Sequence, residues 1–147
     1  MGELIRTVAE AIFVTHPLHS MVVHYPIALS AVGLLFVVLA LALNDPAMER
    51  AAFVCLALTA LTGLLAAFTG YRDVLVRFDG EAQYVGAKAF LGANLILLTG
   101  GMAFARTRWR GLLWNPSTMV LYVGGFVGAL ALTSVLGFLG GVILYGF

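Results

Sequence analysis

The stretch from Thr118 to Phe147 reads TMVLYVGGFVGALALTSVLGFLGGVILYGF, thirty residues without one charged side chain. A helix that crosses the hydrocarbon core of a bilayer needs about 20 consecutive apolar residues. Lipid offers backbone N–H and C=O groups no hydrogen-bond partner, so such a run must be helical. The stretch therefore predicts a transmembrane helix, and at about 1.5 Å per residue it is long enough to tilt or protrude.

Three further apolar runs precede this stretch, and together they predict four membrane spans. We place the spans at about residues 20–43, 51–70, 85–105 and 118–146. Because the connections between consecutive spans are short, the helices must alternate in direction. The predicted fold class is an all-α membrane protein, a four-transmembrane-helix up-down bundle in which residues 1–147 form a single integral membrane domain.

The composition agrees with this fold and excludes several kinds of protein. Apolar residues make up 62% of the chain and charged residues 10%, with a mean hydropathy of +1.03. A soluble domain carries about 25% charged residues, so this chain cannot cover a water-facing surface. Free cytosolic enzymes, nucleic-acid-binding proteins and disulfide-stapled secreted modules are excluded. The single cysteine, Cys55, cannot form an intrachain disulfide.

The N-terminal segment, Gly2 to Thr15, has an amphipathic pattern. Apolar and polar residues fall on opposite faces of a helix: Leu4, Ile5, Val8 and Ile12 on one, and Glu3, Arg6, Thr7 and Glu10 on the other. This pattern is typical of a short helix that lies in the membrane interface.

Aromatic and basic residues predict the span ends and the orientation. Amphipathic rings prefer the headgroup level. The predicted belts are Tyr25, Tyr71, Tyr84 and Tyr145 at one face, and Trp109, Trp114 and Tyr122 at the other. The third connection holds Arg106, Arg108 and Arg110 without an acid, which favours a cytoplasmic location. Both termini would then lie on the periplasmic side of a bacterial inner membrane.

All three histidines lie in the stretch HPLHSMVVHYP, residues 16–26. Imidazole is the commonest metal ligand in proteins and an axial ligand of haem iron. His24 is the deepest of the three, and its depth favours a functional role. For His16 and His19, ligation of a metal or haem and simple solvation at the membrane interface are equally good explanations. The second connection returns to the same face with Asp73, so His16, His19, His24 and Asp73 form a candidate metal site.

A b-type haem places a further demand on these histidines, because two axial ligands must approach the iron from opposite faces. His19 and His24 on one continuous helix cannot do so. His16, or a residue of another chain, would have to complete the pair.

The histidine stretch resembles a known family. His16-Pro17 followed by Val23-His24-Tyr25-Pro26 is similar to the opening signature of a bacterial family catalogued as a predicted membrane protein of unknown function. The resemblance implies four spans and a respiratory or redox-linked context, but no activity. Relatives in that family often carry a further histidine near the start of the third span, whereas residues 86–94 here contain none.

The fourth span contains two pairs of glycines spaced four residues apart, Gly124 with Gly128 and Gly137 with Gly141. Each pair lets another helix approach closely. Nine residues separate Gly128 from Gly137, about 900° at 100° per residue, which reduces to about 180°. We therefore expect one pair to pack inside the bundle and the other to contact a neighbouring helix.

Two functions remain open. The first is a small membrane subunit of, or associated with, a respiratory or photosynthetic electron-transfer complex. It would bind haem b or a transition metal through His24 with His16 or His19. The alternative is a cofactor-free accessory subunit that stabilises a larger membrane complex or binds lipid or pigment.

No serine or cysteine nucleophile has a histidine at a readable spacing, which favours a non-catalytic role. The expected partners are membrane lipids and other membrane subunits or further copies of the chain, with no nucleic acid.

The orientation can be tested with reporter fusions at Pro116 and after Phe147. We expect the two signals on opposite sides of the membrane, with Pro116 cytoplasmic, because the arginines hold the third connection inside. A cytoplasmic signal after Phe147 would contradict the orientation, and signals on one side would contradict the count of four spans.

Overall fold

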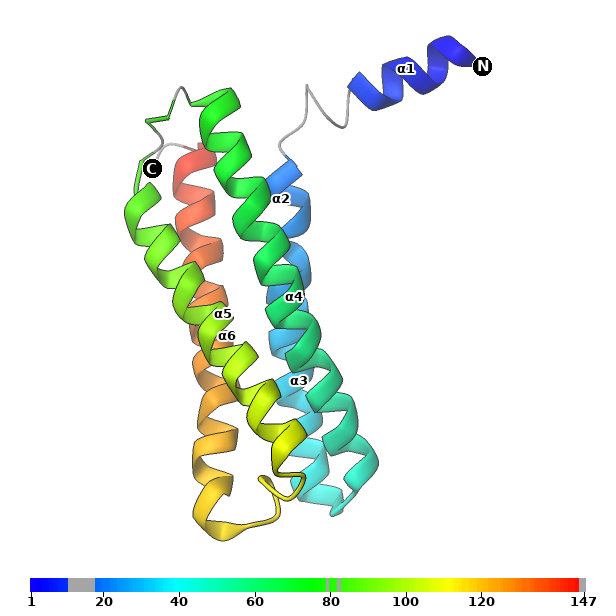
Figure 1. Ribbon diagram of the computed structural model, residues 1–147, viewed down its shortest axis with the longest axis vertical. Helices are drawn as coiled ribbons and strands as arrows, with labels where there is room; N and C mark the ends of the chain where they lie inside the picture. The colour runs from blue at the N-terminus through cyan, green and yellow to red at the C-terminus, as the bar shows by residue number, and fades with distance from the viewer. Residues whose placement is uncertain (11–17, 79, 82, 146–147) are drawn as a thin grey trace.

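The computed structural model describes residues 1–10, 18–78, 80–81 and 83–145. Its helices are α1 (Gly2–Glu10), α2 (Leu18–Val22), α3 (His24–Leu43), α4 (Pro46–Arg77), α5 (Val85–Arg108) and α6 (Pro116–Tyr145). Figure 1 shows α3 to α6 side by side as an elongated bundle, with α1 apart from it.

Four segments are long and apolar enough to cross a membrane: Leu18–Leu43, Pro46–Val76, Val85–Arg108 and Pro116–Ile143. This confirms the predicted four-span bundle. The first span comprises α2 and α3, and two backbone hydrogen bonds link them across Val23. Val23 N–H donates to the carbonyl of His19 at 3.0 Å, and Ile27 N–H donates to that of Val23 at 3.4 Å.

The helices are arranged in a ring, because each packs on the next along the chain and α6 closes back on α3. The turns from α3 to α4 and from α5 to α6 lie at one end (Figure 1). The start of α2, the connection from α4 to α5 and the end of α6 lie at the other. This up-down order brings α2 and the end of α4 together, as predicted for the histidine side.

Helix α4 is longer than predicted at both ends. It begins at Pro46, where the Asp45 carboxylate caps the helix by accepting a hydrogen bond from Ala47 N–H at 2.7 Å. It continues to Arg77 instead of ending at residue 70. Glu49 and Asp73 therefore lie on α4 and not in connections. Both carboxylates are buried, and each accepts hydrogen bonds from the protein: Glu49 from Arg106, and Asp73 from the His19 backbone N–H.

The buried core lies at the end where α3 turns into α4. It consists of Val37, Ala40, Ala52, Leu56, Leu113, Tyr122 and Phe126. Tyr122 packs edge-on against Phe126, with ring centroids 5.3 Å apart. Its predicted place in an aromatic belt is wrong, since the residue is only 3% exposed and its hydroxyl has a buried partner on α4.

Large apolar side chains also cover the outside of the bundle, among them Leu97 at 73% and Leu121 at 77% exposure. A surface of this kind suits contact with lipid tails and not with water. It accords with the composition, which leaves few charges for an outer surface.

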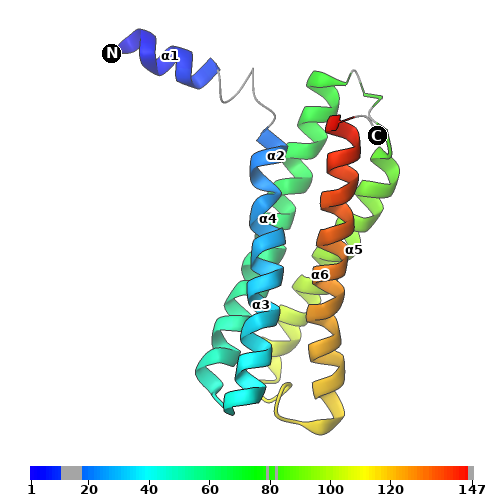
Figure 2. The same ribbon diagram turned by 180° about the vertical axis from the view of Figure 1, so that it is seen from behind.

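The short N-terminal helix is confirmed as α1, which stands away from the bundle in both views (Figure 2). Its apolar residues Leu4, Ile5 and Val8 are exposed, and Arg6 lies 3.8 Å from Glu10 on the polar side. Its place in the membrane interface stays a prediction. Residues 11–15 of the predicted amphipathic segment lie outside the described residues.

Each glycine pair of α6 contributes one member to packing inside the bundle. A Cβ at Gly128 would lie 3.4 Å from Leu98 of α5, and one at Gly137 would lie 3.3 Å from Ile27 of α3. Gly124 and Gly141 have no atom within 4 Å of that position among the described residues. The two pairs thus pack on different neighbours, while a partner on the outer face stays a prediction.

Three helices come close together at Gly33, and this packing can be tested by substitution. A Cβ there would lie 3.1 Å from Phe126 Cε1 and 3.2 Å from Cys55 Cβ. Gly33→Leu should therefore destabilise the bundle by about 1–3 kcal/mol through overpacking. Thermal unfolding in detergent measures the loss. Gly101→Leu is the control, because that position is exposed with open space, and equal melting temperatures would contradict the prediction.

Candidate functional site

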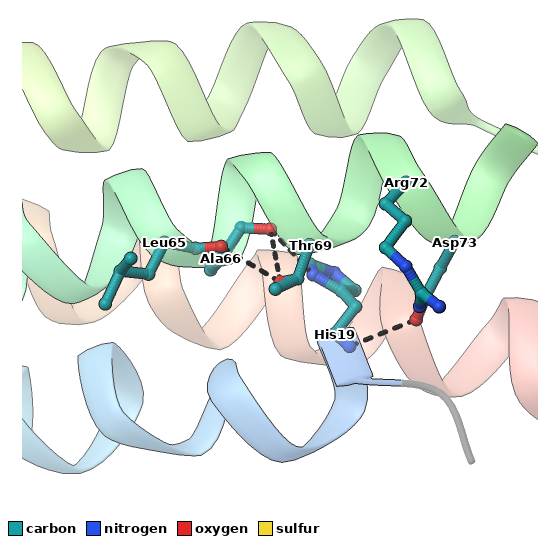
Figure 3. Close-up of polar contacts among 6 residues, drawn as sticks. All are labelled: His19, Leu65, Ala66, Thr69, Arg72 and Asp73. Atoms are coloured by element: carbon teal, nitrogen blue, oxygen red, sulfur yellow. Dashed lines mark hydrogen bonds and ion pairs between the residues drawn. The ribbon is translucent and has the colours of Figure 1, made fainter. Parts of the chain in front are cut away.

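The His19 ring lies against α4 in a fixed orientation (Figure 3). Its Nδ1 atom is 2.8 Å from the carbonyl oxygen of Ala66. Because a carbonyl oxygen only accepts, Nδ1 carries the proton and donates it. Nε2 is then the nitrogen with the free lone pair, and it has no hydrogen-bond partner among the described residues.

Gly70 makes this close approach of ring and helix possible. A Cβ at this position would lie 2.9 Å from both Cε1 and Nδ1 of His19, which is closer than real Cβ contacts allow. Any other residue would push the ring away from α4. The conformation of His19 therefore depends on a glycine one helical turn beyond Ala66.

Asp73 ties the start of α2 to α4 (Figure 3). Its Oδ2 accepts a hydrogen bond from the His19 backbone N–H at 3.0 Å, and its Oδ1 accepts one from Arg72 Nη1 at 3.1 Å. The first N–H groups of a helix lack partners within the helix, so Asp73 acts as a cap supplied by another helix. The residue is 4% exposed, and both of its oxygens contact donors.

Lys88 brings a positive charge to the same end from α5. Its side chain is half-buried, and Nζ lies 3.8 Å from the position of a Cβ at Gly140 on α6. Imidazole, carboxylate and ammonium groups are thus gathered at one end of the bundle.

The other predicted ligands are placed differently. His24 is exposed at the start of α3, and five residues turn a helix by about 500°, so it points about 140° away from His19. Among the described residues, no three His, Cys, Asp or Glu side chains are grouped to hold a metal ion. His16 lies outside the described residues. The site of His16, His19, His24 and Asp73 therefore stays a prediction, of which the described part brings together His19 and Asp73.

A second polar cluster, Glu49 with Arg106 and Tyr122, lies at the opposite end of the bundle. Arg106 donates through Nη2 to Glu49 Oε2 at 2.6 Å and through Nε to Oε1. The Tyr122 hydroxyl donates to Oε1 at 3.3 Å, and the guanidinium lies 5.6 Å from the centroid of the Phe53 ring. Glu49 is 1% exposed, so this cluster joins α4, α5 and α6 through a buried ion pair.

The predicted span ends place Glu49 and Arg106 in connections, so the sequence did not reveal this cluster. The prediction that Arg106 belongs to a loop is wrong, since α5 continues to Arg108. One signal was available: Glu49 stands two residues before a long apolar run, at the end of the bundle that holds the arginines.

A comparison with protein families identifies the chain. The family model described as "Predicted membrane protein (DUF2231)" matches residues 15–147. The chain belongs to the DUF2231 family. The match begins at the histidine stretch and confirms the resemblance noted in the sequence. No curated protein matches this DUF2231 chain, and no solved structure matches it.

The buried ion pair of this DUF2231 protein predicts a large effect of a small substitution. Glu49→Gln keeps the shape of the side chain but leaves the Arg106 charge buried without its partner, which should cost about 3–5 kcal/mol of stability. Equilibrium unfolding in detergent measures the loss.

Two further variants make the interpretation specific. The double variant with Arg106→Gln should recover much of the loss, because no uncompensated charge is left. Arg108→Gln, an exposed neighbour, should have no measurable effect. Equal stability of Glu49→Gln and Arg108→Gln would contradict the assigned role of the pair.

Proposed function

We propose that this DUF2231 protein is a small membrane subunit of, or associated with, an electron-transfer complex, and that His19 binds a haem iron through Nε2. One observation supports this assignment: the hydrogen bond from Nδ1–H to the Ala66 carbonyl. Metal-binding histidines usually donate their other ring N–H to a carbonyl or carboxylate, which fixes the tautomer and the ring orientation. In His19, Nδ1 has this kind of partner in the Ala66 carbonyl, so that Nε2 is left to bind a metal.

The charge beside His19 favours a haem over a bare metal ion. Lys88 brings an ammonium group to the same end of the bundle as His19, and a positive charge opposes a divalent cation in a medium of low dielectric constant. A b-type haem instead carries carboxylates, which a nearby ammonium stabilises. When bound, haem supplies reversible one-electron transfer, with a potential tuned by its axial ligands and surroundings.

A second residue that would hold the haem together with His19 would be one other than His24 of the same chain. His24 starts α3 on the same continuous span as His19 and points in a different direction. His16, or a residue from another chain, would complete the pair. The proposal thus makes His19, rather than His24, the first ligand.

A cofactor-free accessory subunit is the second candidate, and the outer surface of α6 favours it. Gly124 and Gly141 have open space at their Cβ positions among the described residues. Glycines of this kind allow a helix from another subunit to approach closely. This function needs no ligand at His19.

Substitution of the histidines separates the two functions. His19→Ala should remove the bound haem and leave the helical bundle folded, because span formation depends on the apolar runs. His24→Ala is the matched control and should keep the haem. A reduced-minus-oxidised absorption spectrum measures the haem, and elemental analysis measures iron, copper and zinc. Wild-type protein that is colourless and metal-free when taken from its native membrane would contradict ligation and leave the accessory function.

Gly70 provides a test of ring position that leaves the ligand in place. Gly70→Ala should displace the imidazole, since a Cβ would lie 2.9 Å from two ring atoms, and should shift the haem bands or lower the haem content. Gly92→Ala is the control on α5, where no atom lies within 4 Å of the added Cβ. Identical spectra for the two variants would show that the contact of His19 with α4 does not matter for binding.

A further inference from the structure

Two hollows flank the C-terminal end of α5, at the end of the bundle away from His19. The larger, about 780 Å³, lies between α5 and α6. Its apolar lining includes Met102, Ala105, Trp109, Leu112 and Leu121. The smaller, about 300 Å³, lies between α4 and α5 and is lined by Arg50, Phe53, Arg106, Thr107 and Arg110. Arg110 lines both hollows, so the two are adjacent.

The smaller hollow carries positive charge that the protein leaves uncompensated. Glu49 neutralises Arg106, and Asp45 caps α4 through Ala47 N–H. Arg50 and Arg110 are exposed, and within the described ranges no carboxylate lies within ion-pair distance of either. The guanidinium groups of Arg50 and Arg110 therefore line this hollow and can bind an anion by donating hydrogen bonds to it.

We propose that the two hollows together bind one anionic phospholipid. Its phosphate would lie between Arg50 and Arg110, because a guanidinium offers paired N–H donors that match phosphate geometry. An acyl chain would lie in the larger hollow, along Ala105 and Leu121. Basic pockets between transmembrane helices are a known setting for anionic headgroups. The occupant is a lipid and not a free phosphate, because only a lipid fills both the charged and the apolar hollow.

The Glu49–Arg106 pair gives this site a fixed wall. Arg106 lines the smaller hollow, while its ion-pair partner Glu49 also accepts the hydroxyl of Tyr122, which lines the larger hollow. The guanidinium is further held over the Phe53 ring. The buried cluster therefore positions both hollows before any lipid arrives, which lowers the entropy cost of binding.

Native mass spectrometry of the full-length protein, stripped of lipid in detergent, tests the proposal. We expect phosphatidylglycerol to bind more tightly than phosphatidylcholine with the same acyl chains. The double variant Arg50→Gln/Arg110→Gln should weaken phosphatidylglycerol binding roughly 30-fold, as two arginines near an anionic headgroup contribute. Arg108→Gln is the control for loss of charge nearby, since it removes one positive charge two residues from Arg110 and lines neither hollow.

Two further measurements separate a lipid from a soluble anion. Glycerol phosphate should bind far more weakly than the lipid, and Ala105→Phe, which fills the larger hollow, should weaken the lipid but not glycerol phosphate. Equal binding of phosphatidylcholine and phosphatidylglycerol by the wild-type protein would overturn the proposal. So would an equal loss in Arg108→Gln, or glycerol phosphate binding as tightly as the lipid.

Discussion

The interior of a membrane bundle offers no water, so each buried polar group must find its partner on the protein. In the described part of the chain, no buried side-chain nitrogen or oxygen lacks one. Hydroxyl groups inside the helices solve the problem locally by donating to the carbonyl four residues back: Ser30, Thr59, Thr99 and Thr133. The hydroxyl groups of these residues therefore need no hydrogen-bond partner on another helix.

Two clusters satisfy the same constraint over long distances in sequence, and α4 carries a member of each. Near its end, Ala66 and Asp73 hold His19. Near its start, Glu49 holds Arg106 and Tyr122. Because α4 runs from Pro46 to Arg77, one helix fixes the polar groups at both ends of the bundle. Among the described residues, the histidine end leaves one imidazole nitrogen without a partner and the arginine end leaves exposed cations. The two proposals follow from that difference.

The sequence predicts the four spans well, because runs such as Thr118–Phe147 leave no alternative to a helix in lipid. It predicts the ends of α4 poorly, since we ended each span at its last apolar residue. Glu49 and Asp73 lie within the helix, where groups far along the chain bind their carboxylates: Arg106 binds Glu49, and the His19 backbone N–H binds Asp73. Hydropathy carries no information about such distant partners.

The candidate site shows the same limit. The up-down order predicts that the histidine stretch and Asp73 share one end, and the structure brings His19 and Asp73 together. The predicted depth in the membrane favoured His24 as a ligand. Which imidazole faces α4 depends instead on the rotation of the first span about its axis, and hydropathy does not determine that rotation. Gly70, directly before the Tyr71-Arg72-Asp73 segment, was the available signal that a neighbouring side chain approaches α4 closely.

Ligation by His19 is tested most directly by pulsed electron paramagnetic resonance on protein labelled with ring-¹⁵N histidine. In a His16→Met/His24→Gln background, His19 is the only histidine of the chain, and the methionine keeps a haem-binding side chain at position 16. Nitrogen-15 hyperfine coupling to the ferric haem would then come from His19 alone, and we predict that it is present. A haem-containing sample without this coupling would contradict the assignment of His19 as a ligand.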